Sequence, residues 1–290
     1  MTEPTNQPVT GEQAVLDIRN LRTYFYSQDG VARAVDGVSY TVHPKRTLGI
    51  VGESGCGKSV TAMSILRLIP QPPGKIESGE VWFKGTNLLE LKNKKMRKIR
   101  GNSISMIFQE PMTSLNPVFT IGDQIGEVFR IHRGMKKRES IQEAIRMLEL
   151  VKIPAAARRV NEYPHQMSGG MRQRVMIAMA LACDPDLLIA DEPTTALDVT
   201  VQAQVLDLMA ELKDKKDASI LLITHDLGVV AEICDEVAVM YAGQVAEYGS
   251  ADDIFEKPMH PYTLGLLKSR PSLSDIREKV QLSPVKGAVP

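Results

Sequence analysis

The feature that most constrains this chain is a glycine-rich octapeptide, Gly52-Glu53-Ser54-Gly55-Cys56-Gly57-Lys58-Ser59. The apolar residues 48–51 before it resemble a buried strand, and residues 59–69 after it resemble a helix. A motif of this kind between a strand and a helix predicts a phosphate-binding loop, or P-loop. The flanking strand and helix disfavour the alternative, a tight turn with no ligand.

The residue types of this loop suit a chain of phosphates. Glycines let backbone N–H groups curl around phosphate oxygens, and a helix N-terminus adds its positive dipole end. Lys58 adds a full charge, and Ser59 is placed to put its hydroxyl on Mg²⁺. The predicted phosphate-binding residues are Ser54, Gly55, Cys56, Gly57, Lys58, Ser59 and Val60.

Composition limits the other classes of function. With 290 residues, of which 43% are apolar, the chain can bury a sizeable core. Lys+Arg and Asp+Glu each total 35, so no overall field draws the chain to nucleic acid or to an anionic membrane. The three scattered cysteines fit a reducing cytosol without a disulfide or zinc framework.

No segment has the pattern of a membrane anchor. The longest apolar run, residues 175–183, is far shorter than the roughly 20 residues that a membrane helix needs. Residues 1–12 are polar and lack an apolar signal core, so we expect a flexible N-terminus. We therefore expect a soluble chain unless a partner holds it at a membrane.

Strand and helix patterns alternate along the chain. Val38, Tyr40 and Val42 share one face of a predicted strand, and residues 117–164 change to helical spacing. Strands are predicted at residues 15–21, 38–42, 81–83, 103–108, 187–190 and 219–224, and helices at residues 169–182 and 201–212. This alternation predicts an α/β fold whose parallel sheet is covered on both faces, preceded by a β-rich region.

Two carboxylates follow the apolar strand at residues 187–190. Asp191 and Glu192 thereby lie at the carboxyl end of a central strand, where α/β folds bind ligands. We predict that Asp191 holds Mg²⁺ through water and that Glu192 is the general base for an attacking water. An isolated Asp-Glu pair would more often cap a helix, but the upstream P-loop favours the catalytic interpretation.

Ser168, Gly169 and Gly170 precede a strongly apolar helix. Ser168 is a typical N-cap, and the two glycines leave backbone donors open, which predicts a second phosphate site. Because the P-loop already holds its own nucleotide, we expect this second site to face the nucleotide of another subunit. An ordinary capped helix remains the alternative for these three residues alone.

Gln109 and His225 each follow a predicted strand. Both lie at the sheet edge that carries the phosphates, so each is a candidate for contact with the γ-phosphate end of the ligand. A lone histidine after a strand is more often structural. Its coincidence with the other loops at one edge favours a catalytic role here.

Together these motifs closely resemble those of the nucleotide-binding subunits of ABC transporters, over nearly the whole chain. The matching pieces are the Walker A loop (residues 52–59), the Q-loop Gln109, the signature Ser168-Gly169-Gly170, Walker B (residues 187–191) with Glu192, the D-loop Ala196-Leu197-Asp198 and the switch His225. The resemblance implies a P-loop NTPase with a mixed or parallel core sheet, an N-terminal antiparallel β subdomain and a helical subdomain at about residues 117–170. It also implies a head-to-tail dimer, with ATP and Mg²⁺ at each interface, that closes on ATP and reopens after hydrolysis.

The resemblance implies further site residues. Gln109 joins Ser59 and Asp191 around Mg²⁺, and Asp198 joins the nucleotide-binding residues. An aromatic ring near residue 25 stacks on adenine in this family, and alignment from Asn20 favours Phe25 over Tyr24.

Three stretches look like the dipeptide, oligopeptide and nickel importer branch: residues 109–117, residues 190–202 and Pro258-Met259-His260-Pro261-Tyr262-Thr263. This branch implies an ATPase that powers peptide import at the cytoplasmic face of the cell membrane. Implied partners are a second, similar ATP-binding subunit in a heterodimer, two transmembrane permease subunits that dock after the Q-loop, and an extracytoplasmic substrate-binding protein, with no nucleic acid. The implied division is an ATPase domain at residues 13–257 and a C-terminal extension at residues 258–290.

Two departures from the pattern stand out. The signature usually ends in Gln, whereas Met171 cannot hydrogen-bond a ribose. Many relatives continue into a Cys-rich tail that resembles an iron–sulfur site, whereas this sequence, with three scattered cysteines, ends first. We expect either a natural loss of that tail or a truncated sequence.

Other functions remain open at this point. The main alternative is a soluble ABC ATPase acting on ribosomes or DNA, which usually has two fused cassettes or a coiled-coil insertion. An exporter subunit is disfavoured by the importer stretches. The cargo is also open, with nickel, opines, glutathione and oligosaccharides as alternatives to peptides.

Overall fold

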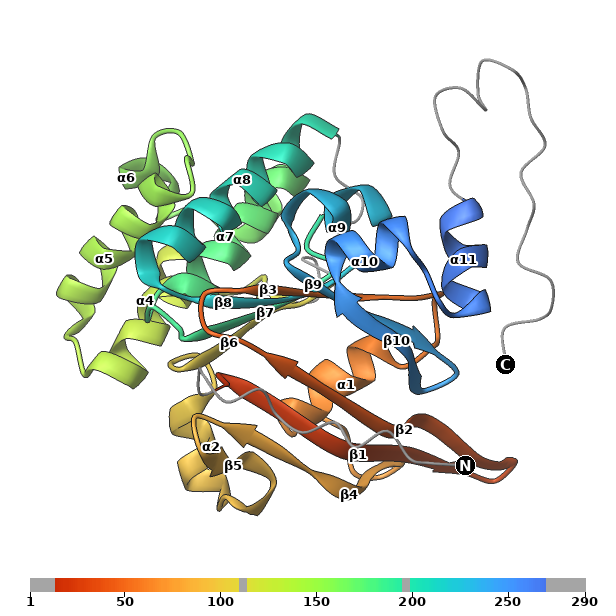
Figure 1. Cartoon of the computed structure of the whole chain (residues 1–290). Helices are drawn as coiled ribbons and strands as arrows, with labels where there is room; N and C mark the ends of the chain where they lie inside the picture. The colour runs from red at the N-terminus through yellow and green to blue at the C-terminus, as the bar shows by residue number, and fades with distance from the viewer. Residues whose placement is uncertain (1–13, 110–113, 195–198, 270–290) are drawn as a thin grey trace.

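Two β-sheets organise the chain in the computed structural model, which describes residues 14–109, 114–194 and 199–269. The antiparallel sheet has the strand order β2-β1-β4-β5, and the larger mixed sheet has the order β10-β9-β3-β8-β7-β6. Figure 1 shows the antiparallel sheet on one side of α1 and the mixed sheet on the other. The α/β fold with an N-terminal β subdomain is therefore confirmed.

The antiparallel sheet comes from the first part of the chain. Its strands are β1 (Leu16–Ser27), β2 (Gly30–Val42), β4 (Gly74–Phe83) and β5 (Thr86–Asn87). Val38, Tyr40 and Val42 are all buried, as their alternation in the sequence predicts. A hairpin joins β1 to β2, and β1 also pairs with β4.

The mixed sheet contains the strands that follow or flank the predicted motifs. They are β3 (Thr47–Val51), β6 (Ile104–Ile107), β7 (Leu187–Asp191), β8 (Ser219–Ile223), β9 (Glu236–Tyr241) and β10 (Gln244–Ser250). The strands from β9 to β6 are parallel to one another, and β10 is antiparallel to β9. The pattern of residues did not predict β9 and β10, which extend the parallel sheet into a mixed one.

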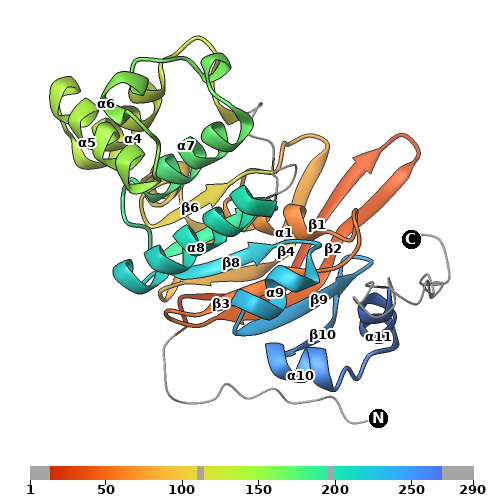
Figure 2. The same cartoon turned by 90° about the horizontal axis from the view of Figure 1, so that it is seen from above.

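Helices cover the mixed sheet and form a separate subdomain. In chain order they are α1 (Lys58–Ile65), η1 (Leu88–Glu90), α2 (Asn93–Ile99), α4 (Ile121–Arg133), α5 (Lys137–Leu150), α6 (Ala156–Arg159), η2 (Pro164–Gln166), α7 (Gly169–Leu181), α8 (Val199–Lys216), α9 (Leu227–Ile233), α10 (Ala251–Glu256) and α11 (Pro261–Lys268). Seen from above, α4, α5 and α6 lie together to one side of the sheet (Figure 2). The helix after the P-loop ends at Ile65, before the predicted end at residue 69, because Arg67 has a left-handed φ of 53°.

The mixed sheet has a hydrophobic core on each face. In β8, Ile220 and Leu222 belong to the core beneath α7 and α8, whereas Leu221 and Ile223 belong to the core shared with α1 and the antiparallel sheet. This alternation is the period of two that a strand buried on both faces requires. Both cores fix the strand ends from which the site residues project.

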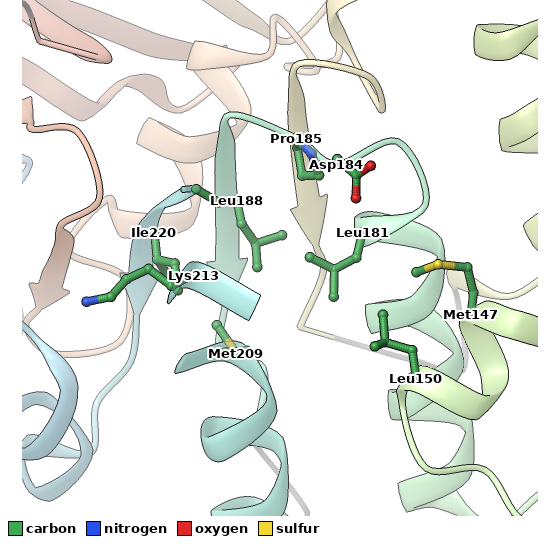
Figure 3. A pocket seen from close by; sticks show the side chains of 10 residues that line it. Met147, Leu150, Leu181, Asp184, Pro185, Leu188, Met209, Lys213 and Ile220 are labelled. Carbon is green, nitrogen blue, oxygen red and sulfur yellow. The ribbon is translucent and has the colours of Figure 1, made fainter. Parts of the chain in front are cut away.

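A small cavity of about 50 Å³ lies where the helical subdomain meets the mixed sheet. Figure 3 shows Met147 and Leu150 on one side of it and Met209, Leu188 and Ile220 on the other. Leu188 and Ile220 are near the amino ends of β7 and β8. The cavity therefore lies at the edge of the sheet away from the predicted site residues.

None of the helices in the described part of the chain is both long and apolar enough to cross a bilayer.

Two isoleucines test whether the core of the mixed sheet carries the stability. Ile189 in β7 is fully buried, and its replacement by alanine should lower the free energy of unfolding by about 2–5 kcal/mol. Ile131 in α4 is 67% exposed, so the same replacement there should change that free energy by about 0.5 kcal/mol or less. Denaturant unfolding followed by circular dichroism measures both. Equal losses in the two variants would contradict the described core.

Candidate functional site

The P-loop connects β3 to α1, as its sequence context predicts. Gly52 has a φ of 149°, and a Cβ there would lie 2.2 Å from the Met240 carbonyl oxygen. Gly57 has a φ of 102°, and its Cβ would lie 2.1 Å from the Ala34 carbonyl oxygen. Only glycine fits either position, because the clashing atoms are backbone and cannot rotate away.

Lys58 lies inside the curve of the loop and is only 6% exposed. Its Nζ donates to the carbonyl oxygens of Gly52 and Glu53, both at 2.8 Å. A phosphate oxygen is a stronger partner for an ammonium group than a neutral carbonyl, so the lysine is suited to an anionic ligand.

The other predicted loop residues differ in exposure. Ser54 and Gly55 are exposed in the middle of the loop, and Val60 is half-buried in α1. Cys56 is buried, and that burial raises the pKa of its thiol above the ordinary value. A buried, protonated thiol is a poor nucleophile and a poor metal ligand, in keeping with a packing role.

Ser59 and Asp191 bring the P-loop and β7 together. The Ser59 hydroxyl donates to Asp191 Oδ1 at 3.0 Å. Asp191 is 4% exposed, and burial raises the pKa of its carboxyl despite this hydrogen bond. An ionised carboxylate in such a place gains from a nearby cation, and a hydroxyl with a carboxylate is a donor set that suits Mg²⁺.

The protein itself offers few metal ligands around this pair. Among residues 14–109, 114–194 and 199–269, no group of three or more His, Cys, Asp or Glu side chains could hold a metal ion. Mg²⁺ commonly binds through one or two protein oxygens together with substrate phosphates and waters. The residues present therefore fit Mg²⁺ carried with a nucleotide better than a metal held in a protein cage.

Two side chains from separate loops, Gln109 and His225, meet the side chain of Glu192. Gln109 Nε2 donates to Glu192 Oε2 at 3.0 Å, and His225 Nδ1 lies 3.4 Å from the same oxygen. The glutamate side chain is 15% exposed and the histidine 64% exposed. A sheltered carboxylate thus faces a solvent-accessible histidine beside the Ser59–Asp191 pair, an arrangement that can bind a water and accept its proton.

The backbone of Glu192 is in the left-handed region, with a φ of 46°. A non-glycine residue there costs about 1–2 kcal/mol, and such strain concentrates at functional sites. The Glu192 N–H donates to the Ile223 carbonyl oxygen of β8 at 2.8 Å, which holds the turn in place. Nothing in the sequence pattern around Glu192 indicates this conformation.

The signature residues open α7 at the protein surface. Ser168 caps the helix and accepts the Met171 N–H at 3.4 Å, as expected of an N-cap. Ser168 and Gly169 are exposed, and a Cβ at Gly169 would meet nothing within 4 Å. No hydrogen bond among the described residues joins Ser168, Gly169 or Gly170 to the P-loop.

The predicted adenine-binding ring lies on β1. Phe25 is half-buried, and a Cβ at Gly74 would lie 2.9 Å from its Cε1, so the ring packs against the start of β4. The neighbouring Tyr24 donates its hydroxyl proton to Asp36 Oδ1 at 2.7 Å, and the guanidinium of Arg33 lies over its ring. Phe25 stays a prediction as the adenine contact.

Asp198 lies outside the described residues, together with Ala196 and Leu197 of the predicted D-loop.

The structure adds one residue to the neighbourhood of the P-loop. The hydroxyl of Tyr262 in α11 accepts the Glu53 N–H at 3.1 Å. The sequence marks Tyr262 only as part of the importer-branch stretch, and a contact between residues so far apart in the chain leaves no local signal.

Two family models match the chain. The ABC transporter model matches residues 35–195, and the model described as "Oligopeptide/dipeptide transporter, C-terminal region" matches residues 246–290.

Curated relatives match nearly the full length of this chain. The probable peptide ABC transporter ATP-binding protein y4tR of Sinorhizobium fredii is 56% identical over 276 residues, which cover 95% of this chain and 82% of that protein. The dipeptide transport ATP-binding protein DppD of Bacillus subtilis is 54% identical over 278 residues, which cover 96% of this chain and 82% of that protein.

Solved structures support the same relationship. The dimeric, post-hydrolysis structure of the ATP-binding cassette MJ0796 bound to ADP and Pi has a TM-score of 0.73 and 26% sequence identity, with 81% of this chain and 98% of that chain covered. The fold, the P-loop and the sequence matches agree, and the chain belongs to the ATP-hydrolysing, ATP-binding subunits of ABC transporters.

Proposed function

We propose that this chain is the ATP-hydrolysing subunit that powers the import of peptides, or of a related small solute, by an ABC transporter. The observation that carries the ATPase part is the convergence of Gln109, Glu192 and His225 beside the Ser59–Asp191 pair. The match of residues 246–290 to the oligopeptide/dipeptide C-terminal region supports the cargo class. The relatives described as peptide and dipeptide transport proteins support it further.

At the P-loop, Lys58 and the backbone N–H groups bind the phosphates of ATP, and Phe25 stacks on the base. Ser59 and Asp191 hold Mg²⁺, and the amide oxygen of Gln109 joins them. When bound, Mg²⁺ neutralises charge that develops on the phosphates. Mg²⁺ suits this pair because both residues offer hard oxygen ligands.

Glu192 accepts a proton from the attacking water, while Gln109 and His225 orient its carboxylate. The two contacts to the same carboxylate oxygen support this division of roles. The contribution of a positioned general base is typically about 10²–10⁴-fold in rate.

The second half of each ATP site comes from another subunit. Ser168 and Gly169 are exposed at the N-terminus of α7, next to Gly170, and this geometry suits a phosphate held by an opposed subunit. Asp198 joins the nucleotide-binding residues. The opposed subunit is a similar ATP-binding chain, in a heterodimer.

The membrane partners dock between the sheet and the helical subdomain. A groove of about 550 Å³ lies there, with apolar walls that include Met106, Phe108 and Val128. Ile131 on its wall is 67% exposed, and Arg100 and Glu127 add charges of both signs. An apolar groove with a few charges suits a helix from a permease subunit.

The chain therefore works at the cytoplasmic face of the cell membrane, with two permease subunits and an extracytoplasmic substrate-binding protein. It divides into an ATPase domain at residues 13–257 and a C-terminal extension at residues 258–290.

Replacing Glu192 by glutamine tests the base assignment. Glu192→Gln should retain ATP binding but lose turnover by about 10²-fold or more, because the amide cannot accept the proton from water. The matched control is Glu232→Gln, an exposed glutamate in α9, which should hydrolyse ATP normally. Phosphate release by the assembled transporter measures turnover, and normal turnover by Glu192→Gln would show the base assignment to be wrong.

Replacing Lys58 by alanine tests the phosphate cradle. The variant should bind ATP about 10- to 100-fold more weakly, the typical effect of losing a charged hydrogen-bond donor. Lys94→Ala removes an exposed lysine from α2 and serves as the control. Calorimetric titration with Mg·ATP measures the affinities, and an unchanged dissociation constant for Lys58→Ala would contradict the cradle.

Chelation tests the metal. Excess EDTA should abolish ATP turnover, and added Mg²⁺ should restore it. Asp191→Asn should raise the Mg²⁺ concentration for half-maximal turnover about 10-fold or more, since a negative charge that attracts Mg²⁺ is lost. Asp252→Asn, at an exposed carboxylate in α10, should leave that concentration unchanged. Full turnover in EDTA would exclude the proposed metal site.

A further inference from the structure

The C-terminal helix α11 lies beside the P-loop although the two are far apart in the sequence (Figure 1). Tyr262, the second residue of α11, is only 7% exposed. Its hydroxyl accepts the Glu53 N–H at 3.1 Å, which connects the C-terminal helix directly to the phosphate-binding loop.

This contact fixes one particular peptide of the loop. In the Gly52–Glu53 peptide, the carbonyl oxygen accepts a hydrogen bond from Lys58 Nζ, and the N–H donates one to the Tyr262 hydroxyl. The plane of the peptide is therefore held at both ends. Burial raises the pKa of Tyr262, although the hydrogen bond from Glu53 acts in the opposite direction, and the hydroxyl stays protonated at neutral pH.

Tyr262 is itself held in place by β9, β10 and the residues that precede α11. Its ring packs against that of Tyr241 at the end of β9, with the centroids 4.5 Å apart. Its N–H donates to His260 Nδ1 at 3.1 Å. The Glu247 carboxylate of β10 accepts the N–H groups of Met259 and His260, at 2.7 and 3.1 Å. The hydroxyl is thus presented to the loop by a supported side chain.

We propose that Tyr262 is a positioning residue for ATP binding, which acts through the Glu53 amide to hold the P-loop in the shape that receives the phosphates. When a phosphate binds Lys58, the Gly52 carbonyl oxygen loses its hydrogen bond from the lysine. The hydrogen bond from the Glu53 N–H to Tyr262 then remains to hold that peptide in place. The C-terminal extension therefore sets the affinity for nucleotide. The inference rests on the proposed function only in taking ATP as the ligand.

The test compares two tyrosines that each lose a hydroxyl. In the full-length protein, Tyr262→Phe should weaken Mg·ATP binding about 3- to 10-fold, the effect of one hydrogen bond. The control is Tyr248→Phe in β10, whose hydroxyl donates to Glu236 and the Thr41 carbonyl, away from the loop. Glu247→Gln weakens the hydrogen bonds from the Met259 and His260 N–H groups that hold the start of α11. This variant should also bind Mg·ATP more weakly than the wild type.

Two further measurements separate positioning from a general structural role. Tripolyphosphate has no nucleobase, so it reports on the phosphate-binding loop alone. Its affinity, measured by competition with a fluorescent nucleotide, should be about 3- to 10-fold lower in Tyr262→Phe than in the wild type. In the assembled transporter the KM for ATP should rise while kcat stays within about 2-fold.

Equal affinities of the wild type and both the Tyr262 and Glu247 variants would overturn the inference. So would an equal loss in Tyr248→Phe, or a loss for ATP without a loss for tripolyphosphate. Failure of the wild type itself to bind Mg·ATP would instead overturn the proposed function, so the two outcomes are distinguishable.

Discussion

The structure depends on two close approaches of the P-loop backbone to the backbone of neighbouring strands. Gly52 and Gly57 pass so near the carbonyl oxygens of Met240 and Ala34 that no side chain fits. Those carbonyls belong to β9 and β2, one in each sheet. The P-loop therefore packs closely against one strand of each sheet. A hydrogen bond from the Glu53 N–H to Tyr262 adds a contact with α11.

The parallel strands explain how the remaining polar residues gather. Asp191 and Glu192 come at the end of β7, Gln109 follows β6 and His225 follows β8, and these three strands are adjacent. Because parallel strands end at the same edge, their loops meet beside the P-loop. The left-handed turn at Glu192 then directs its carboxylate toward Gln109 and His225. The strain at Glu192 is offset by the surrounding packing, as is usual at functional sites.

Sequence reasoning reached the fold class and the family because both depend on local patterns. Alternating strands and helices and a P-loop in context were sufficient for the α/β fold, and the joint order of motifs was sufficient for the ABC transporter family. Features created by long-range contact were missed. The strands β9 and β10 have no distinctive period, the turn at Glu192 depends on a bond to Ile223, and Tyr262 meets Glu53 only after folding. The early end of α1 at Ile65 was missed for a different reason, because it reflects a local conformation at Arg67 that apolar spacing does not encode.

We propose above all that this chain supplies half of an ATP site and needs an opposed subunit to complete it. The most direct measurement is sedimentation velocity of a turnover-deficient form saturated with Mg·ATP, alone and with the cognate ATP-binding and membrane subunits. The account predicts paired ATP-binding subunits with trapped nucleotide, which separate when ADP replaces ATP. A preparation that is saturated with Mg·ATP but keeps its ATP-binding subunits unpaired under all these conditions would contradict it.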